Sequence, residues 1–318
     1  QMAFTTNERG QWRVGTLDLR TGKRTWHAVL GHRLDRLNDD LAPRLAWHPK
    51  GKTLAFALEL EGAPRLGLVN MATQNVDLRE IFKIDQILDM AYSPDGRILL
   101  MSALQDGHSD LYRYDVLANN HRPLWRDRFD DLQPAFWPGS TQFMFASNRP
   151  DDTLRKDLLD HPFPPNLDLY VGDLADDPIE LTRWTHTPDV DERHPHPMDH
   201  QEFLMVQRKE GDIEDGLGFG WRDSTIVAVD TIVRYRNFTQ LRSATAMPQG
   251  ATAAFLGRDT SRFMLPRAGI HHWVAMPMPD LSALHSQEPE VQMAVSDDLP
   301  YPTHLPDWDR PFAPNHIN

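Results

Sequence analysis

Short hydrophobic runs separated by turn residues dominate the pattern of the chain. The runs at 53–58 (TLAFAL), 98–103 (ILLMSA) and 142–148 (QFMFASN) are flanked by turns rich in Gly, Pro and Asp. Runs of this kind are typical of buried strands and too short for ordinary helices. Residues 110–115 (DLYRYD) instead alternate, which places successive side chains on opposite faces of a strand. The pattern predicts an all-β chain with tight hairpin turns such as Asp95-Gly96.

The same unit of strands recurs at a regular period. Each unit opens on an Ala-aromatic-x-Pro anchor or a near variant, and the anchors begin at Ala46, Ala91 and Ala135, which are 45 and 44 positions apart. A short strand ends at the Pro, and an apolar strand, an alternating strand and an outer strand follow in turn. Four short strands in a period in the mid-forties are typical of a β-propeller blade.

This period predicts a six-bladed β-propeller of four-stranded antiparallel blades. The predicted blades span 1–38, 43–84, 88–128, 132–186, 191–247 and 250–298. The first blade opens on what should be its second strand, so a C-terminal segment or sequence upstream of Gln1 would supply the missing strand. The last blade is degenerate. Residues 299–318 are rich in proline and without periodicity, and we expect an extended tail after a propeller domain at 1–298.

Charge and composition narrow the classes of partner. The 318 residues carry a formal net charge of -13, which argues against nucleic acid and anionic membrane surfaces as partners. No run of about 18 apolar residues occurs, so we expect no transmembrane segment. The chain contains no cysteine and no signal-peptide pattern, so export would require a signal outside these residues.

Three histidines near the fifth predicted blade are the candidate metal ligands. His194, His196 and His200 lie among aspartates, and imidazole suits Zn or Ni. The segment aligns with the inner-strand anchors, however, and its prolines restrict how the side chains converge. A structural role is therefore favoured, and we expect no cofactor. Asp95, Asp106 and Asp110 are likewise interpreted as turn and strand-end residues, because an EF-hand spacing is absent.

Catalytic motifs are absent, and two insertions and the tail offer binding surface instead. Neither Gly-x-Ser-x-Gly nor His-Glu-x-x-His occurs, so the sequence predicts no enzyme activity of its own. The insertion at 149–166 could contain a short helix at 154–161, and 209–222 would be a flexible, glycine-rich loop. Loops on propeller faces commonly carry binding residues. Most tryptophans are expected to pack between blades. The candidate protein-binding residues are Phe163, Phe219, Trp221, Trp308 and Phe312.

Several segments resemble the TolB-type repeat, also called the PD40 or WD40-like repeat. Residues 92–97 (YSPDGR) match its first half, and 145–149 (FASNR) with 168–171 (DLYV) match its second half. Residues 48–51 (HPKG) and 137–140 (WPGS) depart from the Ser-Pro-Asp-Gly pattern. The resemblance implies a six-bladed propeller, but function depends on sites grafted onto the fold.

The fold and the lack of catalytic motifs together favour a binding protein. We expect a non-catalytic, TolB-like scaffold or accessory subunit of a bacterial envelope complex. Its partners would be an outer-membrane protein or a lipoprotein, in the periplasm or at the outer membrane. Residues 191–195 and 222–226 also resemble large TolB-like envelope proteins of Bacteroidota. The alternative is the propeller domain of a larger peptidase, where it would gate or orient substrate.

Overall fold

The computed structural model is built of strands throughout its described part. It describes residues 1–6, 12–29, 42–150, 166–187, 189–198, 202–211, 215–223, 226–234, 238–246, 252–259 and 271–277, with side chains up to residue 222. These ranges hold no apolar helix of membrane-spanning length.

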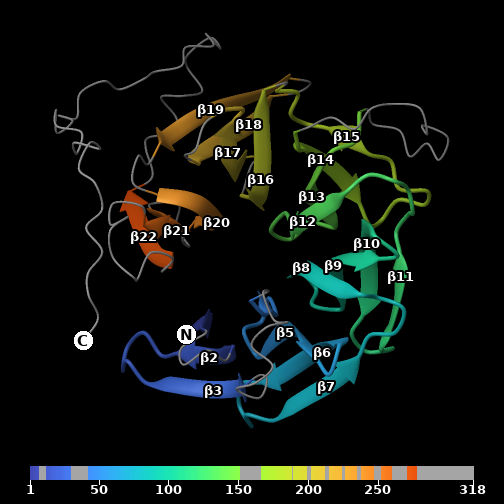
Figure 1. Cartoon of the computed structure of the whole chain (residues 1–318), viewed down its shortest axis with the longest axis vertical. Coiled ribbons are helices and arrows are strands. Elements are labelled where there is room, and N and C mark those ends of the chain that lie inside the picture. The colour runs from blue at the N-terminus through green and yellow to red at the C-terminus, as the bar shows by residue number, and fades with distance from the viewer. Residues whose placement is uncertain are drawn as a thin grey trace, which may run out of the picture. The chain divides into compact units, whose positions relative to one another are not determined.

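The described strands form antiparallel sheets that follow one another in chain order (Figure 1). The first sheet contains β1 (Met2–Thr6), β2 (Arg13–Leu17) and β3 (Arg24–Val29). The second sheet contains β4 (Arg44–Trp47), β5 (Thr53–Leu60), β6 (Ala63–Asn70) and β7 (Val76–Glu80). The third sheet contains β8 (Gln86–Tyr92), β9 (Ile98–Gln105), β10 (His108–Asp115) and β11 (Asn120–Pro123).

Three further sheets complete the described series. The fourth contains β12 (Asp131–Phe136), β13 (Gln142–Ser147), β14 (Asp168–Asp173) and β15 (Thr182–Arg183). The fifth contains β16 (Val190–Pro197), β17 (Glu202–Lys209), β18 (Gly216–Asp223) and β19 (Ile226–Arg234). The sixth contains β20 (Phe238–Ala246), β21 (Thr252–Asp259) and β22 (His271–Pro277).

The first strands of neighbouring sheets contact one another, as the inner strands of propeller blades do. Strand β4 contacts β8, β8 contacts β12, β12 contacts β16, and β16 contacts β20 (Figure 1). This arrangement confirms the predicted all-β propeller of four-stranded antiparallel blades. The chain divides into two compact units, at 1–281 and 282–318. The second unit lies outside the described residues, so the blade number, the boundary at 298 and the tail at 299–318 stay predictions.

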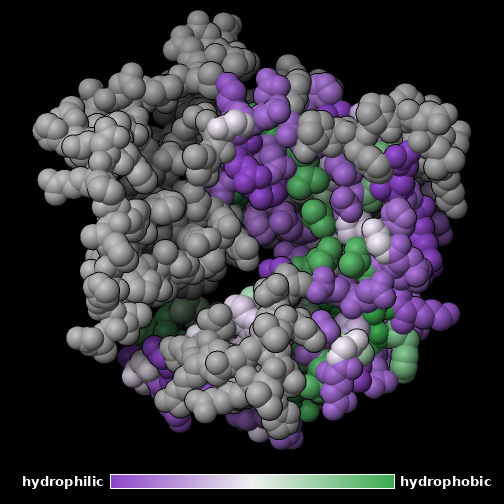
Figure 2. Space-filling model, viewed as in Figure 1, coloured by the Kyte–Doolittle hydropathy of each residue, from purple (hydrophilic) through white to green (hydrophobic). Residues whose placement is uncertain are grey.

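The second strand of each four-stranded sheet lies at the core. Strand β9 is buried along most of its length, and β13 and β17 follow the same pattern. The outer strands β7 and β11 have no buried residue. Figure 2 shows hydrophilic residues over most of the outer surface of the described sheets, with hydrophobic residues between and inside them.

Four sheets share a cross-strand pair between an aromatic ring and a glycine. The paired residues are Phe4 and Gly15, Phe56 and Gly67, Phe143 and Gly172, and Phe203 and Gly220. A Cβ atom built on Gly67 would lie 2.1 Å from the Phe56 ring, and one on Gly220 would lie 2.1 Å from the Phe203 ring. The glycine is therefore required because the ring covers its backbone.

These pairs explain a wrong prediction about the fifth blade. Residues 216–222 were expected as a flexible glycine-rich loop, but they form strand β18 in the middle of the fifth sheet. Strand β20 also differs from the prediction, because it lies in the sixth sheet and not in a fifth blade that ends at 247. The insertion at 149–166 lies mostly outside the described residues.

The Ser-Pro-Asp-Gly motif at 93–96 forms the hairpin turn between β8 and β9 that the sequence predicts. The Ser93 hydroxyl donates to Asp95 Oδ1 at 2.6 Å, and the Arg97 N–H donates to the same oxygen at 3.0 Å. Gly96 has a φ of 75°, which side-chain-bearing residues rarely adopt. Asp95 is thus a turn residue, as expected.

Candidate functional site

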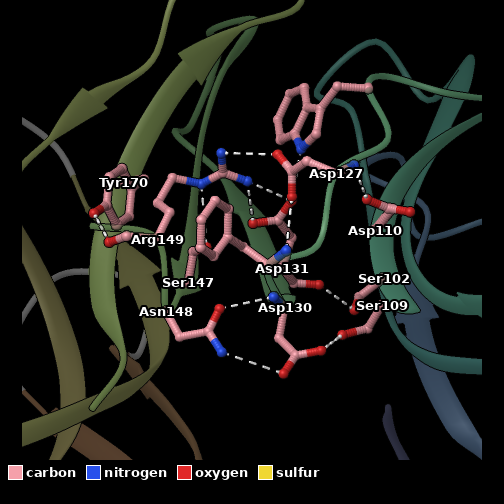
Figure 3. A network of polar contacts seen from close by, with 12 residues as sticks. Ser102, Ser109, Asp110, Asp127, Asp130, Asp131, Ser147, Asn148, Arg149 and Tyr170 are labelled. Atoms are coloured by element: carbon pink, nitrogen blue, oxygen red, sulfur yellow. Dashed lines mark hydrogen bonds and ion pairs between the residues drawn. The ribbon is translucent and has the colours of Figure 1, made fainter. Parts of the chain in front are cut away.

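Ionisable side chains are buried at the junction of the third and fourth sheets, centred on Arg149 (Figure 3). Arg149 lies two residues after the end of β13 and is fully buried. Its Nη2 atom donates to Asp131 Oδ1 at 2.7 Å and Oδ2 at 2.8 Å, and Nη1 donates to Asp127 at 3.1 Å. This forked geometry gives a buried guanidinium two carboxylate partners.

Further contacts fix the same network between the two sheets (Figure 3). Ser102, on β9, donates to the Asp131 carbonyl at 2.6 Å, and Ser109, on β10, donates to Asp130 at 2.5 Å. The Trp125 indole donates to Asp131 at 2.6 Å, and its ring centroid lies 5.6 Å from the Arg149 guanidinium carbon. The network therefore joins neighbouring sheets through satisfied polar contacts.

Asp110 is a carboxylate of this network that none of the described ion pairs includes. Burial raises its pKa to about 7, and the negative charges of Asp131 and Asp127 add to the effect. Asp110, Asp127 and Asp131 place candidate ligand atoms within 4.8 Å of one another. Because Arg149 already neutralises two of these carboxylates, the arrangement suits a structural junction better than a cation site.

The histidines of the fifth sheet do not join a metal-binding group within the described residues. The one described group with three candidate ligand atoms is the aspartate cluster, which contains neither His194 nor His196. His194 lies in a bulge of β16 with a φ of 51°, and its backbone N–H donates to Gln133 at 2.8 Å. Burial lowers the pKa of His196 to about 4. His200 lies outside the described residues.

A second buried carboxylate lies between the fourth and fifth sheets. Glu192 on β16 is fully buried, and its Oε1 accepts hydrogen bonds from Thr187 at 2.7 Å and Gln207 at 3.3 Å. Its Oε2 has no hydrogen-bond partner in the described part of the chain. Burial raises the pKa of Glu192 to about 7. Within the described residues, no arginine pairs with Glu192 as Arg149 pairs with Asp131 in the preceding sheet.

A pocket of about 340 Å³ opens along the fourth sheet beside the fifth. The turn between β12 and β13, the end of β14, strand β15 and residues from the fifth sheet form its walls. The side chains that line it include Trp137, Ser140, Gln142, Val171, Asp173, Asp176, Glu180, Thr182, Trp184, Met198 and Arg222. Its volume is at the lower end of the range of about 300–1,000 Å³ typical of small-molecule sites.

Two nearly buried tryptophans line this pocket. Trp137 and Trp184 are 7% and 8% exposed, and their ring centroids lie 5.1 Å apart. Neither indole N–H has a hydrogen-bond partner among the residues that the structure describes. The Arg222 guanidinium carbon lies 5.2 Å from the Trp184 ring centroid, which is cation–π geometry.

Carboxylates surround the rim of the same pocket. Asp176 and Glu180 are exposed, and Asp173 is half-buried at the end of β14. Asp173 accepts the Ala175 N–H at 2.9 Å, but no described cationic side chain pairs with any of the three carboxylates. Against three negative charges the described lining supplies the single positive charge of Arg222. The pocket is therefore negative at its mouth.

Sequence reasoning placed the binding residues elsewhere. Phe219 is fully buried on β18, so it is a core residue and not an exposed anchor. Trp221 is half-buried, and its ring stacks on Phe219 with centroids 5.6 Å apart. Phe163, Trp308 and Phe312 lie outside the described residues. The one available signal for the pocket was the departure from Ser-Pro-Asp-Gly at 137–140, which puts Trp137 on its wall.

Comparison with known proteins shows the fold through solved structures. No protein-family model matches the chain, and no curated protein matches it by sequence. A putative TolB from Agrobacterium tumefaciens is similar with a TM-score of 0.60 and 17% identity, over 87% of this chain and 86% of that one. TolB from Acinetobacter baumannii is similar with a TM-score of 0.54 and 16% identity, over 87% of this chain.

Similar propellers also occur in enzymes. An oligogalacturonate lyase in complex with manganese has a TM-score of 0.56 and 14% identity, over 85% of this chain and 72% of that one. Tricorn protease has a TM-score of 0.56 and 16% identity over 87% of this chain. The chain spans 63% of the Acinetobacter TolB and 28% of tricorn protease. At these identities the likeness shows a TolB-like β-propeller fold and leaves function open.

Proposed function

We propose that this chain is a non-catalytic, TolB-like propeller that binds protein partners in a bacterial envelope complex. The observation that carries the proposal is the pocket beside Trp137 and Trp184, which combines buried aromatic walls with carboxylates at its rim that pair with no described cation. Aromatic side chains together with polar and charged groups that fix orientation are typical of sites that recognise a partner. The partner would be an outer-membrane protein or a lipoprotein, met in the periplasm or at the outer membrane.

The distribution of buried charges supports binding over catalysis. Arg149 pairs with Asp127 and Asp131, and Arg183 pairs with Asp168, so these groups hold neighbouring strands and sheets together. Paired in this way, these buried groups are poor candidates for general acid–base catalysis. The resemblance to TolB proteins and to the large envelope proteins of Bacteroidota agrees with a scaffold role.

The second candidate is the propeller domain of a larger peptidase. The likeness to tricorn protease, of which this chain spans 28%, favours it. In that case the propeller would gate or orient substrate for a catalytic region elsewhere in the parent protein. The scaffold proposal expects a separate partner protein bound to the chain, whereas the peptidase proposal expects a catalytic region in the same, longer polypeptide.

Site-specific cross-linking in the native host separates the two candidates. A photo-reactive amino acid replaces Thr182, an exposed residue that lines the pocket, and a matched variant carries it at Leu117, which is 82% exposed in the turn between β10 and β11. After irradiation, purification and peptide mass spectrometry, we expect a stoichiometric outer-membrane protein or lipoprotein on the Thr182 variant alone. A longer chain with a protease-like region and no separate partner would favour the peptidase.

A further inference from the structure

The pocket of the fourth sheet has a charge pattern that selects among ligands. Asp173, Asp176 and Glu180 lie around it, and no described cation pairs with them. Carboxylates near one another and near low-dielectric walls attract a cation more strongly than isolated surface carboxylates do. A ligand that brings a positive charge would therefore gain from this rim, and an anionic ligand would be repelled.

The aromatic wall narrows the ligand further. Arg222 already lies over the Trp184 ring, which directs an incoming cation toward Trp137 and the carboxylates. Both indole nitrogens are buried, with less than 1 Å² of accessible surface each, so the two tryptophans offer a ligand ring carbons and no accessible hydrogen-bond donor. A suitable ligand would thus carry an apolar stem beside its positive charge.

A protein segment with a basic side chain meets both requirements. Its ammonium or guanidinium group pairs with the carboxylates, and its methylenes pack against the indole rings. A bare metal ion brings charge without an apolar stem, and a neutral sugar brings no charge. The volume of about 340 Å³ suits one side chain with its flanking backbone.

We propose that this pocket binds a lysine or arginine side chain presented by an extended segment of the partner protein. The inference rests on the proposed function, and it specifies the chemistry that the partner must supply. Positive charge at the rim and burial against Trp137 would together hold the segment at the fourth sheet.

Short peptides test the ligand class directly. Fluorescein-labelled Gly-Gly-Lys-Gly-Gly and its arginine counterpart are titrated to millimolar concentration against the full chain, with norleucine and glutamate peptides for comparison. Binding is followed by fluorescence anisotropy at low and high salt. We expect the basic peptides alone to bind, with affinity that falls as salt rises. Equal binding of the norleucine peptide would overturn the proposal.

Two double variants with the same change in charge locate the site. Asp176→Asn with Glu180→Gln removes two rim charges, and Glu59→Gln with Glu61→Gln removes two exposed charges on the second sheet. We expect the rim variant to weaken binding about three- to tenfold and the control variant to leave it unchanged. Equal weakening by both would show attraction by net charge alone and would contradict a pocket.

The outcomes separate this inference from the proposed function. If cross-linking at Thr182 captures an envelope partner but basic peptides do not bind, the scaffold role stands and the ligand class is wrong. If basic peptides bind at the rim and cross-linking captures no partner, the pocket chemistry stands and the scaffold role is wrong.

Discussion

Arg149 is a fully buried cation whose two carboxylate partners are buried with it. Replacing Arg149 with Met would leave Asp127 and Asp131 without their counter-charge in the core. Removing one partner of a buried ion pair typically costs about 3–5 kcal/mol, because the remaining charge stays desolvated. We therefore expect a loss of this size in the free energy of unfolding, measured by urea denaturation.

Two further variants test that explanation for Arg149. Adding Asp127→Asn and Asp131→Asn to Arg149→Met should recover part of the lost stability, because no unpaired charge remains. The matched control is Arg65→Met, which keeps an apolar stem and whose partner Glu80 has a side chain 51% exposed, and it should cost about 1 kcal/mol or less. A triple variant less stable than Arg149→Met alone would contradict the charge argument.

Glu192 should make stability depend on pH. Burial raises its pKa from an ordinary 4.5 to about 7, and the charge of Asp168 acts in the same direction. Between these values the unfolded chain loses the proton and the folded chain keeps it, so the free energy of unfolding falls as pH rises. Glu192→Gln should remove a fall of about 2–3 kcal/mol, measured by urea denaturation from pH 4.5 to 8.

His196 and Asp110 also make stability depend on pH, so they contribute to the curve measured in the Glu192 experiment. The lowered pKa of His196 makes stability rise with pH between about 4 and 6.5, which opposes the effect of Glu192. The raised pKa of Asp110 acts with Glu192, and Asp110→Asn should remove only its own share. If the wild type and Glu192→Gln have parallel stability curves over this range, the carboxyl is not titrating as described.

At the scale of the strand, the cross-strand pair of a phenylalanine and a glycine in β5 and β6 occurs in four of the sheets. A methyl group on Gly67 would meet the Phe56 ring at 2.1 Å, so Gly67→Ala forces the ring or the strand to move. Overpacking of this kind costs about 1–3 kcal/mol. In a double-mutant cycle read by urea denaturation, Phe56→Leu should reduce the cost of Gly67→Ala. An unchanged cost in that background would exclude the ring contact as the cause.

The same phenylalanine–glycine pair shows why the sequence predicted some strands and missed β18. Runs such as 98–103 carry side chains of one kind on successive positions, so their burial is readable without the structure. In β18 the positions 216, 218 and 220 are glycines, and the alternation that marks a strand loses one of its two faces. The Phe203 ring, on the neighbouring strand β17, fills the space that a side chain at Gly220 would occupy. The sequence does not show that these two residues are paired.

The candidate pocket could not be predicted from the sequence for a related reason. Trp137 and Trp184 were expected to pack between blades, and both do pack in the core of the fourth and fifth sheets. Their second role depends on Asp173, Asp176 and Glu180, which come from the end of β14 and the segment before β15. A pocket built from turns of different strands leaves no contiguous motif.

At the scale of the whole described unit, stability should be graded from the core strands outward. Successive inner strands contact one another, and polar networks such as that of Arg149 link the third sheet to the fourth. The second strands β9, β13 and β17 lie between two paired neighbours and are mostly buried. The outer strands pair on one side within their sheets. Burial and pairing therefore decline together across each sheet.

Hydrogen exchange measured by mass spectrometry should resolve that gradient. Backbone amides in buried, doubly paired strands open only through larger unfolding events, whereas exposed edge strands open locally at lower free energy. Peptides from β9, β13 and β17 should exchange the slowest, and those from β7 and β11 at least about tenfold faster, which corresponds to about 1.4 kcal/mol. In Arg149→Met, faster exchange should reach β9 and β13 before β5, because the lost network joins the third and fourth sheets. Uniform exchange across all strands of a sheet would instead mean that each sheet opens as one unit, and that the buried contacts between sheets do not rank the strands.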